Sequence, residues 1–360
     1  MGSVELRGVC VSRDGRSLLD AVDLVVADGE RLVLLGPSGS GKTTLLRALA
    51  GLDEVTAGTI WIDGRDVTRW PPRERDVGMV NQQASLQPHL DVAGNVGFPL
   101  RIRRTPKPEI DTRVAAEARS FSFRDRLTRR PATLSAGEQH EVALARSLVR
   151  KVGLLLLDEP LARADAPRRA VLLRELIAVQ EGYGVTLLCA TNDQRVAMGL
   201  ANRCAVLDGG RIVQVGRPDE LFARPASTFV AGFLGTPPMN LLPGRVERGV
   251  GGARIVAGPL RIPSFAPAVS DLAGANCTVG VRPSDLHRAT DADVVTIEEP
   301  VRATAFLGAE IEVRLGGADG ELVAHLDRPT PEVGELIRLG IDPAAVHLFD
   351  THGGAVAHGV

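Results

Sequence analysis

One short segment of the chain has the residue types needed to bind a phosphate group. It fits the pattern G-x-x-x-x-G-K-[ST], and it reads Gly36-Pro37-Ser38-Gly39-Ser40-Gly41-Lys42-Thr43, followed by Thr44. Glycines let backbone N–H groups converge on phosphate oxygens, because no Cβ stands in the way. We expect Lys42 to reach the β- and γ-phosphates of a nucleotide and the Thr43 hydroxyl to coordinate Mg²⁺.

Two carboxylates could supply the rest of a hydrolytic site. Asp158 and Glu159 directly follow the apolar run of residues 154–157. Asp158 suits a Mg²⁺ ligand, and Glu159 suits a general base that activates the attacking water. An acidic pair in this position also occurs where a helix begins, so the pair alone is weak evidence. Together with the phosphate-binding loop, it favours nucleoside triphosphate hydrolysis.

The elements expected around these residues alternate between apolar strands and helices. A strand over 31–35 leads into the loop, and Leu45, Leu46 and Leu49 recur at helical spacing after it. Further strands are predicted over 154–157 and 185–190, each ending in polar residues, with a helical pattern over 166–180. This alternation predicts an α/β fold with a mostly parallel sheet, whose ligand lies at the carboxyl ends of the strands.

The middle and the end of the chain have a different character. Residues 82–150 contain no strand-like run and predict a helical insertion. Its segment 101–130 carries ten Arg or Lys and four acids, Glu109, Asp111, Glu117 and Asp125, which favours an exposed helical face over a phosphate-binding patch. The Pro-rich residues 236–243 predict a linker. Short alternating segments beyond it predict an all-β, barrel-like domain, so we expect one domain over 1–235 and a second over 236–360.

Composition argues against several classes of function. The net charge of −2 and the 3% content of aromatic residues disfavour binding to nucleic acid. No apolar run approaches the roughly 18 residues that span a bilayer, and the first residues do not resemble a signal peptide. The four cysteines are far apart and predict reduced thiols in a cytosolic protein; they are Cys10, Cys189, Cys204 and Cys277.

Two further segments resemble those of the ATP-binding cassette (ABC) ATPases. The segment Gly78-Met79-Val80-Asn81-Gln82 resembles the family's Gln-bearing loop, and Leu134-Ser135-Ala136-Gly137-Glu138 resembles its LSGGQ signature. Both lie in the family's order between the phosphate-binding loop and Asp158, and the resemblance spans about residues 4–235. It implies a head-to-tail pair of cassettes, in which Ser135, Ala136 and Gly137 contact ATP on the other chain. It also implies that Gln82 acts in catalysis and Mg²⁺ binding, and that Asp165 lies at the dimer seam.

The carboxyl-terminal residues resemble those of the ATPase subunits of maltose-type carbohydrate importers. The resemblance rests on residues 237–243, 279–286 and 340–349, and importers of iron, polyamines and sulfate carry related tails. It implies an oligonucleotide-fold-like β domain that stabilises the dimer and receives regulatory signals. The implied cofactors are ATP and Mg²⁺. The implied partners are transmembrane permease subunits, a second cassette as a homodimer or heterodimer, and indirectly an extracytoplasmic solute-binding protein. The chain would lie on the cytoplasmic face of the membrane as a peripheral subunit that serves sugar transport.

Four residues depart from the family pattern. Asn192 stands where the family has a catalytic switch histidine, and Arg13 stands where an aromatic residue stacks on adenine. In the signature, Ala136 replaces a glycine, and Glu138 replaces a glutamine and brings a negative charge near the phosphate. These substitutions either weaken catalysis or are tolerated.

The leading hypothesis is an ATPase that powers uptake of a carbohydrate-like solute. The alternatives are a catalytically weakened subunit paired with a competent cassette, or an importer ATPase for iron, polyamine or sulfate. A cassette acting in translation or repair is disfavoured, because such proteins usually carry two cassettes in one chain and this chain has one phosphate-binding loop. The apolar residues of segment 82–99 predict docking of a membrane-subunit helix, with burial inside the insertion as the alternative.

Overall fold

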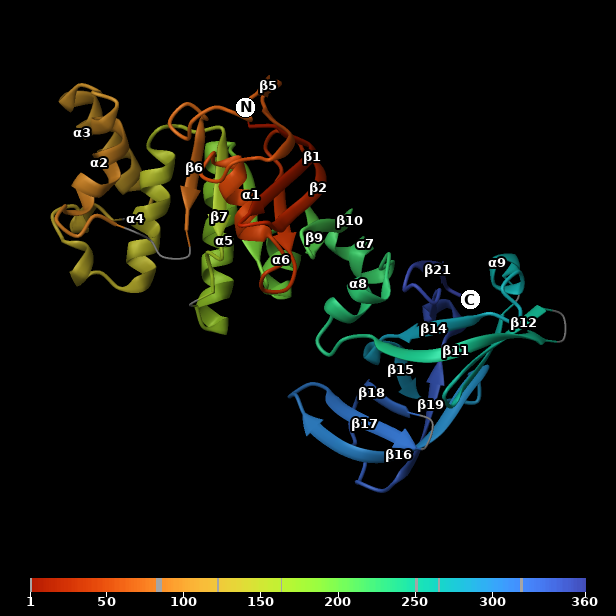
Figure 1. Ribbon diagram of the computed structural model, residues 1–360. Helices are drawn as coiled ribbons and strands as arrows, with labels where there is room; N and C mark the ends of the chain where they lie inside the picture. Colours follow the sequence, from red (N-terminus) through yellow and green to blue (C-terminus); the bar gives the residue numbers. More distant parts are fainter. Residues whose placement is uncertain are drawn as a thin grey trace. The chain divides into compact units, whose positions relative to one another are not determined.

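The computed structural model describes residues 2–81, 86–121, 123–162, 164–249, 252–264, 266–317 and 320–360. These residues divide into two compact units, 1–218 and 219–360. Figure 1 shows the first unit in red to green and the second in green to blue.

The central sheet of the first unit positions the candidate site. Its strand order is β10 (Arg211–Gly216), β9 (Arg203–Asp208), β3 (Arg31–Leu35), β8 (Thr186–Thr191), β7 (Leu154–Asp158) and β6 (Val77–Val80). All neighbouring strands from β9 to β6 are parallel, and β10 pairs antiparallel with β9. Every residue of β7 and β8 is buried, as expected for strands covered on both faces. The predicted parallel sheet is confirmed.

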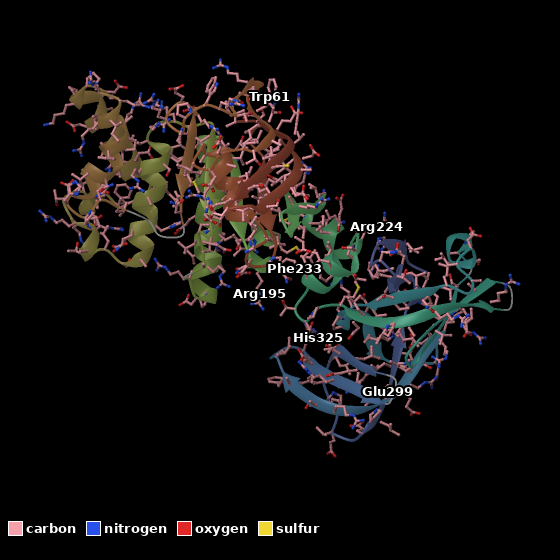
Figure 2. All side chains as sticks on the ribbon, in the orientation of Figure 1. Trp61, Arg195, Arg224, Phe233, Glu299 and His325 are labelled. Atoms are coloured by element: carbon pink, nitrogen blue, oxygen red, sulfur yellow. The ribbon has the colours of Figure 1, made fainter. Side chains whose placement is uncertain are left out.

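A second, antiparallel sheet covers the phosphate-loop helix of the first unit. Its order is β2 (Arg16–Val26), β1 (Val4–Arg13), β4 (Ala57–Ile62) and β5 (Arg65–Asp66). Helix α1 (Lys42–Leu49) buries Leu45, Leu46 and Leu49 in a core to which both sheets contribute. The ring of Trp61 (Figure 2), on β4, lies 4.9 Å from the guanidinium of Arg7 on the neighbouring strand β1. The burial of Leu45, Leu46 and Leu49 in this core fixes α1 at the point where β3 ends.

The predicted insertion is helical and has its own core. It contains α2 (Val92–Ile102), α3 (Lys107–Ser120) and α4 (Ala136–Leu148), with short 3₁₀ turns at η1 (Arg124–Arg126) and η2 (Pro131–Thr133). Two predictions need correction. Val92 and Val96 are fully buried in this core, so they offer no surface to a membrane subunit. Glu117 is buried as well, on the inner side of α3, whereas its charge had indicated an exposed face.

Two more helices complete the first unit. Helix α5 (Ala166–Tyr183) follows β7, and α6 (Gln194–Leu200) follows β8. Each begins with an aspartate that accepts hydrogen bonds from the first turn, Asp165 for α5 and Asp193 for α6. Both helices therefore begin near the carboxyl ends of parallel strands.

The second unit is mainly β structure, as predicted. One sheet runs β13 (Leu260–Ser264), β12 (Gly252–Ala257), β11 (Asn240–Gly249), β14 (Asn276–Val281), β20 (His347–Phe349) and β21 (Ala355–His358). The other runs β15 (Leu286–Arg288), β19 (Leu336–Ile341), β16 (Val295–Phe306), β17 (Ile311–Gly317) and β18 (Gly320–Leu326). The two sheets bury their apolar residues in one core.

Short helical segments precede and interrupt these sheets. They are α7 (Pro218–Ala223), α8 (Thr228–Phe233), α9 (Pro267–Ser270), η3 (Pro283–Asp285) and η4 (Pro343–Ala345). Residues 240–243, expected to be linker, form the start of β11 and pair with β14. All four cysteines are free thiols. Within the described ranges, no helix has the length and apolar character needed to cross a bilayer.

Candidate nucleotide-binding site

The phosphate-binding loop lies between β3 and α1, as the motif predicted. Gly41 precedes the helix with a φ of 106°, a conformation that residues with a Cβ rarely adopt. The ammonium of Lys42 donates hydrogen bonds to the carbonyl oxygens of Gly36 (2.9 Å) and Pro37 (2.8 Å). The buried hydroxyl of Ser40 finds no hydrogen-bond partner in the part of the chain that the structure describes. The loop therefore holds a fixed cation and an unsatisfied hydroxyl beside the start of a helix.

Thr43 and Asp158 meet although they are far apart in the sequence. The Thr43 hydroxyl donates a 2.9 Å hydrogen bond to Oδ1 of Asp158. Asp158 ends β7, which is separated from β3 only by β8, so both side chains lie at the same edge of the sheet. Burial raises the pKa of Asp158, whereas the Thr43 hydrogen bond and the Lys42 charge lower it. A hydroxyl and a carboxylate side by side are oxygen donors of the kind that Mg²⁺ prefers.

Glu159 is held in place by the strand next to its own. Its backbone has a φ of 49°, the left-handed region that non-glycine residues seldom occupy. The Thr191 hydroxyl donates to Oε2 (3.1 Å), and the backbone N–H of Asn192 donates to Oε1 (3.0 Å). Burial raises the pKa of Glu159, and the Thr191 hydrogen bond opposes that shift. The unusual backbone and two donors together fix the carboxylate of the candidate base.

Lys42 shares this electrostatic environment. Only 7% of its surface is exposed, and this burial lowers the pKa of its ammonium, whereas the charges of Glu159 and Asp158 favour the protonated form. The structure thus brings Lys42, Thr43, Asp158 and Glu159 to one edge of the central sheet.

The signature-like segment forms the beginning of α4. Ser135 caps the helix by accepting a hydrogen bond from the N–H of Glu138, and the Glu138 carboxylate accepts one from the N–H of Ser135 (2.7 Å). This is a capping box. The same carboxylate lies 3.3 Å from Nη1 of Arg126. The carboxylate of Glu138 is therefore bound by the N–H of Ser135 and paired with Arg126, and its effect on phosphate binding stays a prediction.

Two backbone donors stay available beside this cap. The capping box uses the N–H groups of Ser135 and Glu138, and no acceptor among the described residues binds those of Ala136 and Gly137. A cavity of about 300 Å³ adjoins them and is also lined by Glu159, Pro160 and Arg168. The signature and the candidate base of the same chain therefore border one hollow.

Other predicted site residues have local roles in the structure. Asp165 caps α5 and accepts the N–H of Arg168 (2.9 Å). The exposed guanidinium of Arg13 forms a 3.0 Å ion pair with Asp53, so its stacking on adenine stays a prediction. Asn192 contacts Glu159 through its backbone. Gln82 lies outside the described residues.

The sequence placed Thr191 among the polar residues at a strand end but gave it no role, and it gave no indication of Arg168. Thr191 is the first polar residue after the apolar run of β8, and the rule that assigned a role to Asp158 at a strand end could have assigned one to Thr191 as well. Arg168 had no such signal, because it lies within the first turn of a helix and its neighbour in space, Gly137, is far away in the sequence.

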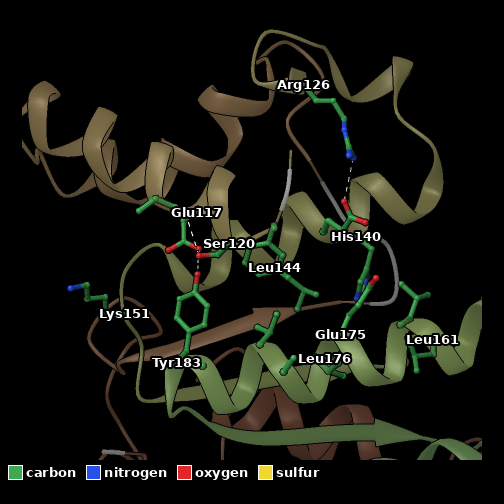
Figure 3. Close-up of a pocket in the computed structure, with 17 residues that line it drawn as sticks. Glu117, Ser120, Arg126, His140, Leu144, Lys151, Leu161, Glu175, Leu176 and Tyr183 are labelled. Atoms are coloured by element: carbon green, nitrogen blue, oxygen red, sulfur yellow. Dashed lines mark hydrogen bonds and ion pairs between the residues drawn. The ribbon is translucent and has the colours of Figure 1, made fainter. Parts of the chain in front are cut away.

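A larger cavity, of about 680 Å³, lies between the helical insertion and α5 (Figure 3). At one end the hydroxyl of Tyr183 donates a 2.5 Å hydrogen bond to the buried carboxylate of Glu117. Leu144 and Leu176 line the middle of the cavity. The Glu117–Tyr183 hydrogen bond thus joins α3 to the end of α5.

Comparisons with known proteins agree with this geometry. The family described as ABC transporter matches residues 19–162, that described as MalK OB fold domain matches residues 235–286, and that described as TOBE domain matches residues 279–349. The chain is 44% identical to an sn-glycerol-3-phosphate import ATP-binding protein of Cereibacter sphaeroides, over 98% of this chain and 99% of that protein. It is 38% identical to a sulfoquinovosyl glycerol transport ATP-binding protein of Agrobacterium fabrum, over 97% of this chain and 98% of that protein.

A solved structure resembles the first unit. It is the dimeric post-hydrolysis state of the ATP-binding cassette MJ0796 bound to ADP and Pi, with a TM-score of 0.54 and 27% identity. The match covers 60% of this chain and 98% of that one. From the matched families, the full-length relatives and the cassette fold, we conclude that the chain belongs to the ABC transporter family, as an import ATPase with a carboxyl-terminal OB-fold and TOBE region.

Proposed function

We propose that the chain is the ATP-hydrolysing subunit of an importer for a carbohydrate-like solute. The observation that carries the proposal is the convergence of a lysine, a hydroxyl and two carboxylates at the edge of the sheet where the phosphate-binding loop lies. The two relatives named above transport sn-glycerol-3-phosphate and sulfoquinovosyl glycerol, according to their names. Both solutes are polyhydroxylated, and this supports a carbohydrate-like solute here. The relatives' similarity over the whole chain favours this class over iron, polyamine or sulfate.

The loop binds the phosphates of ATP. Lys42 uses two of its three N–H donors on loop carbonyls, so one remains for a phosphate oxygen. Thr43 and Asp158 would hold Mg²⁺, since their oxygens already lie 2.9 Å apart. When bound, Mg²⁺ neutralises charge on the phosphate oxygens. We assign the whole of Gly36–Thr43, with Thr44, to the nucleotide site.

Glu159 orients and deprotonates the attacking water. Its carboxylate must be ionised to accept a proton, and the hydrogen bonds from Thr191 and Asn192 favour that ionised form. The same two donors fix the direction of its oxygen lone pairs. Gln82 and the Asn192 side chain are proposed to help place the water and the γ-phosphate.

A second cassette completes each site in this proposal. The free N–H groups of Ala136 and Gly137, with the Ser135 hydroxyl, would contact the γ-phosphate of ATP on the opposing chain, and Asp165 would lie at the seam. The cassette structure named above is dimeric, which supports this arrangement. The chain would sit on the cytoplasmic face of the membrane, against permease subunits that receive solute from an extracytoplasmic binding protein. In segment 82–99, the exposed Pro88 and the partly buried Leu90, Phe98 and Pro99 would be available for that contact.

A second candidate is a weakly hydrolysing subunit paired with a competent cassette. It is favoured by Asn192, whose amide side chain cannot become cationic near neutral pH as a histidine can. Turnover of the chain alone and with its permease would separate the two candidates.

The test of the nucleotide site is Lys42→Ala, with Lys107→Ala as a control, because Lys107 is exposed at the start of α3. We expect the wild type and the control to bind Mg-ATP and release phosphate. Lys42→Ala should lose ATP affinity or turnover, because no other residue of the loop brings a positive charge to the phosphates. Unchanged affinity and turnover in Lys42→Ala would refute the proposed site.

A further inference from the structure

We propose that Arg168 is a phosphate-binding residue of the signature, contacting the γ-phosphate of ATP held by an opposing copy of the chain. The inference rests on the proposed function, in which Ser135, Ala136 and Gly137 face that ATP. It adds a charged group to a segment that otherwise offers only a hydroxyl and backbone N–H groups.

The first observation is the position of the guanidinium. A Cβ atom on Gly137 would lie 1.9 Å from Nη2 of Arg168 and 2.9 Å from its Cζ. The guanidinium therefore occupies the space directly beside the Gly137 backbone. Arg168, Ser135, Ala136 and Gly137 also line the same cavity of about 300 Å³. An anion bound by the free N–H groups of Ala136 and Gly137 would lie next to this cation.

The second observation is how Arg168 is held. Its backbone N–H donates to Asp165, the cap of α5, which fixes where the side chain leaves the helix. Among the described residues, no carboxylate or carbonyl accepts a hydrogen bond from its guanidinium. The neighbouring Arg169, in contrast, forms a 2.8 Å ion pair with Asp193 and donates to the Ala164 carbonyl. Within the part of the chain that the structure describes, the side-chain donors of Arg168 therefore stay available for a ligand.

The third observation is the charge balance at the signature. Glu138 is the acid of this segment, and its carboxylate is bound by the N–H of Ser135 and paired with Arg126. The cation of Arg168 is on the side of Gly137, where the free N–H groups are. A guanidinium can donate two parallel hydrogen bonds to a phosphate, which a neutral side chain cannot do. Arg168 would therefore offset the loss of contacts caused by the unusual signature.

The experiment measures ATP-dependent dimerisation of the full chain carrying Glu159→Gln, which slows hydrolysis so that the ATP-bound state persists. Sedimentation velocity with Mg-ATP gives the dimer dissociation constant for this parent and for Arg168→Leu, Arg168→Lys and Arg174→Leu. Arg174 is exposed on the same helix and serves as the matched control. Binding of a fluorescent ATP analogue to dilute chain gives the affinity of the loop alone.

We expect Arg168→Leu to weaken ATP-dependent dimerisation about tenfold or more, since a hydrogen bond to a charged group is lost. Arg168→Lys should recover part of the lost dimer affinity, and Arg174→Leu should dimerise as the parent does. ATP affinity of the dilute chain and thermal stability without nucleotide should not change in Arg168→Leu, which separates a phosphate contact from a structural role.

Two results would overturn the inference. One is ATP-dependent dimerisation of Arg168→Leu that equals that of the parent. The other is a parent that binds ATP when dilute but never dimerises, which would leave the proposed nucleotide site intact. Failure of the wild-type chain to bind ATP at all would instead refute the proposed function, and the inference with it.

Discussion

The hydrogen bond between Tyr183 and Glu117 should stabilise the first unit measurably. Glu117 is 7% exposed, and Tyr183→Phe would remove the hydroxyl that donates to its carboxylate while keeping the ring. A hydrogen bond to a charged group contributes about 1.5–3 kcal/mol. For a unit of 218 residues, each kcal/mol shifts the melting temperature by about 2–4 °C. We therefore expect Tyr183→Phe to melt roughly 3–12 °C lower at pH 8.

The effect should depend on pH in a defined direction. Burial raises the pKa of Glu117, and the Tyr183 hydrogen bond partly opposes this. An acid whose folded pKa is raised makes the protein lose stability as the pH rises from the ordinary Glu value of 4.5 to the folded value. In Tyr183→Phe, loss of the hydroxyl raises the pKa of Glu117 in the folded protein further. The difference between Tyr183→Phe and the wild type should therefore be largest above that pKa and smallest below 4.5, where the carboxyl is protonated.

The assay is thermal unfolding followed by far-ultraviolet circular dichroism, with Glu117→Gln as the matched background. In that background no charge is buried, so Tyr183→Phe should cost only about 0.5–1.5 kcal/mol, the value for a neutral hydrogen bond. Equal losses in the two backgrounds, or an unchanged melting temperature of Tyr183→Phe at pH 8, would refute the reasoning.

Three further changes test the site itself. Thr191→Val should slow phosphate release about tenfold. It should also move the acid limb of the pH–rate profile to higher pH, because the Thr191 hydroxyl lowers the pKa of Glu159. An acid limb at the wild-type pH would contradict this. Glu138→Ala should remove the capping box, cost about 1 kcal/mol of stability and lower the melting temperature, whereas Glu138→Gln should keep both. Equal melting temperatures for Glu138→Ala and the wild type would show that the capping box does not contribute to stability. The triple change Asn192→His, Ala136→Gly and Glu138→Gln should raise turnover at least about tenfold if these departures limit catalysis, and no increase would mark them as neutral.

The catalytic edge of the sheet was predictable because its signals are local. The phosphate-binding loop is one continuous motif, and the strand before it, residues 31–35, has the predicted bounds. The contact between Thr43 and Asp158 spans 115 residues, but it follows from the rule that parallel strands share their carboxyl edge. The Glu117–Tyr183 bond follows no such rule. It depends on how the insertion packs on α5, and a charged residue on a helix is normally expected to face solvent.

Two other features of the structure differ from what the sequence led us to expect, and the sequence contained part of the reason. Ser135 and Glu138 have the S-x-x-E spacing of a capping box, so the fate of the Glu138 charge could have been inferred from this segment alone. Residues 240–243 were expected to be linker because of nearby prolines, yet Pro243 lies within β11, opposite Thr278 of β14. In the structure Asn240 and Leu242 face the buried side of β11, but Asn240 is polar and Leu241 is apolar, so no alternation of apolar and polar residues marked this strand in the sequence.

The most direct test of the central claim compares the wild type with Glu159→Gln. ATP affinity and steady-state phosphate release are measured on the same preparations. Glutamine keeps the shape of the side chain and removes the base, so affinity should stay within about twofold while phosphate release falls by about 10²-fold or more. Turnover that survives in Glu159→Gln would contradict the assignment of Glu159 as the base. Loss of ATP affinity together with turnover would show that Glu159 serves binding rather than hydrolysis.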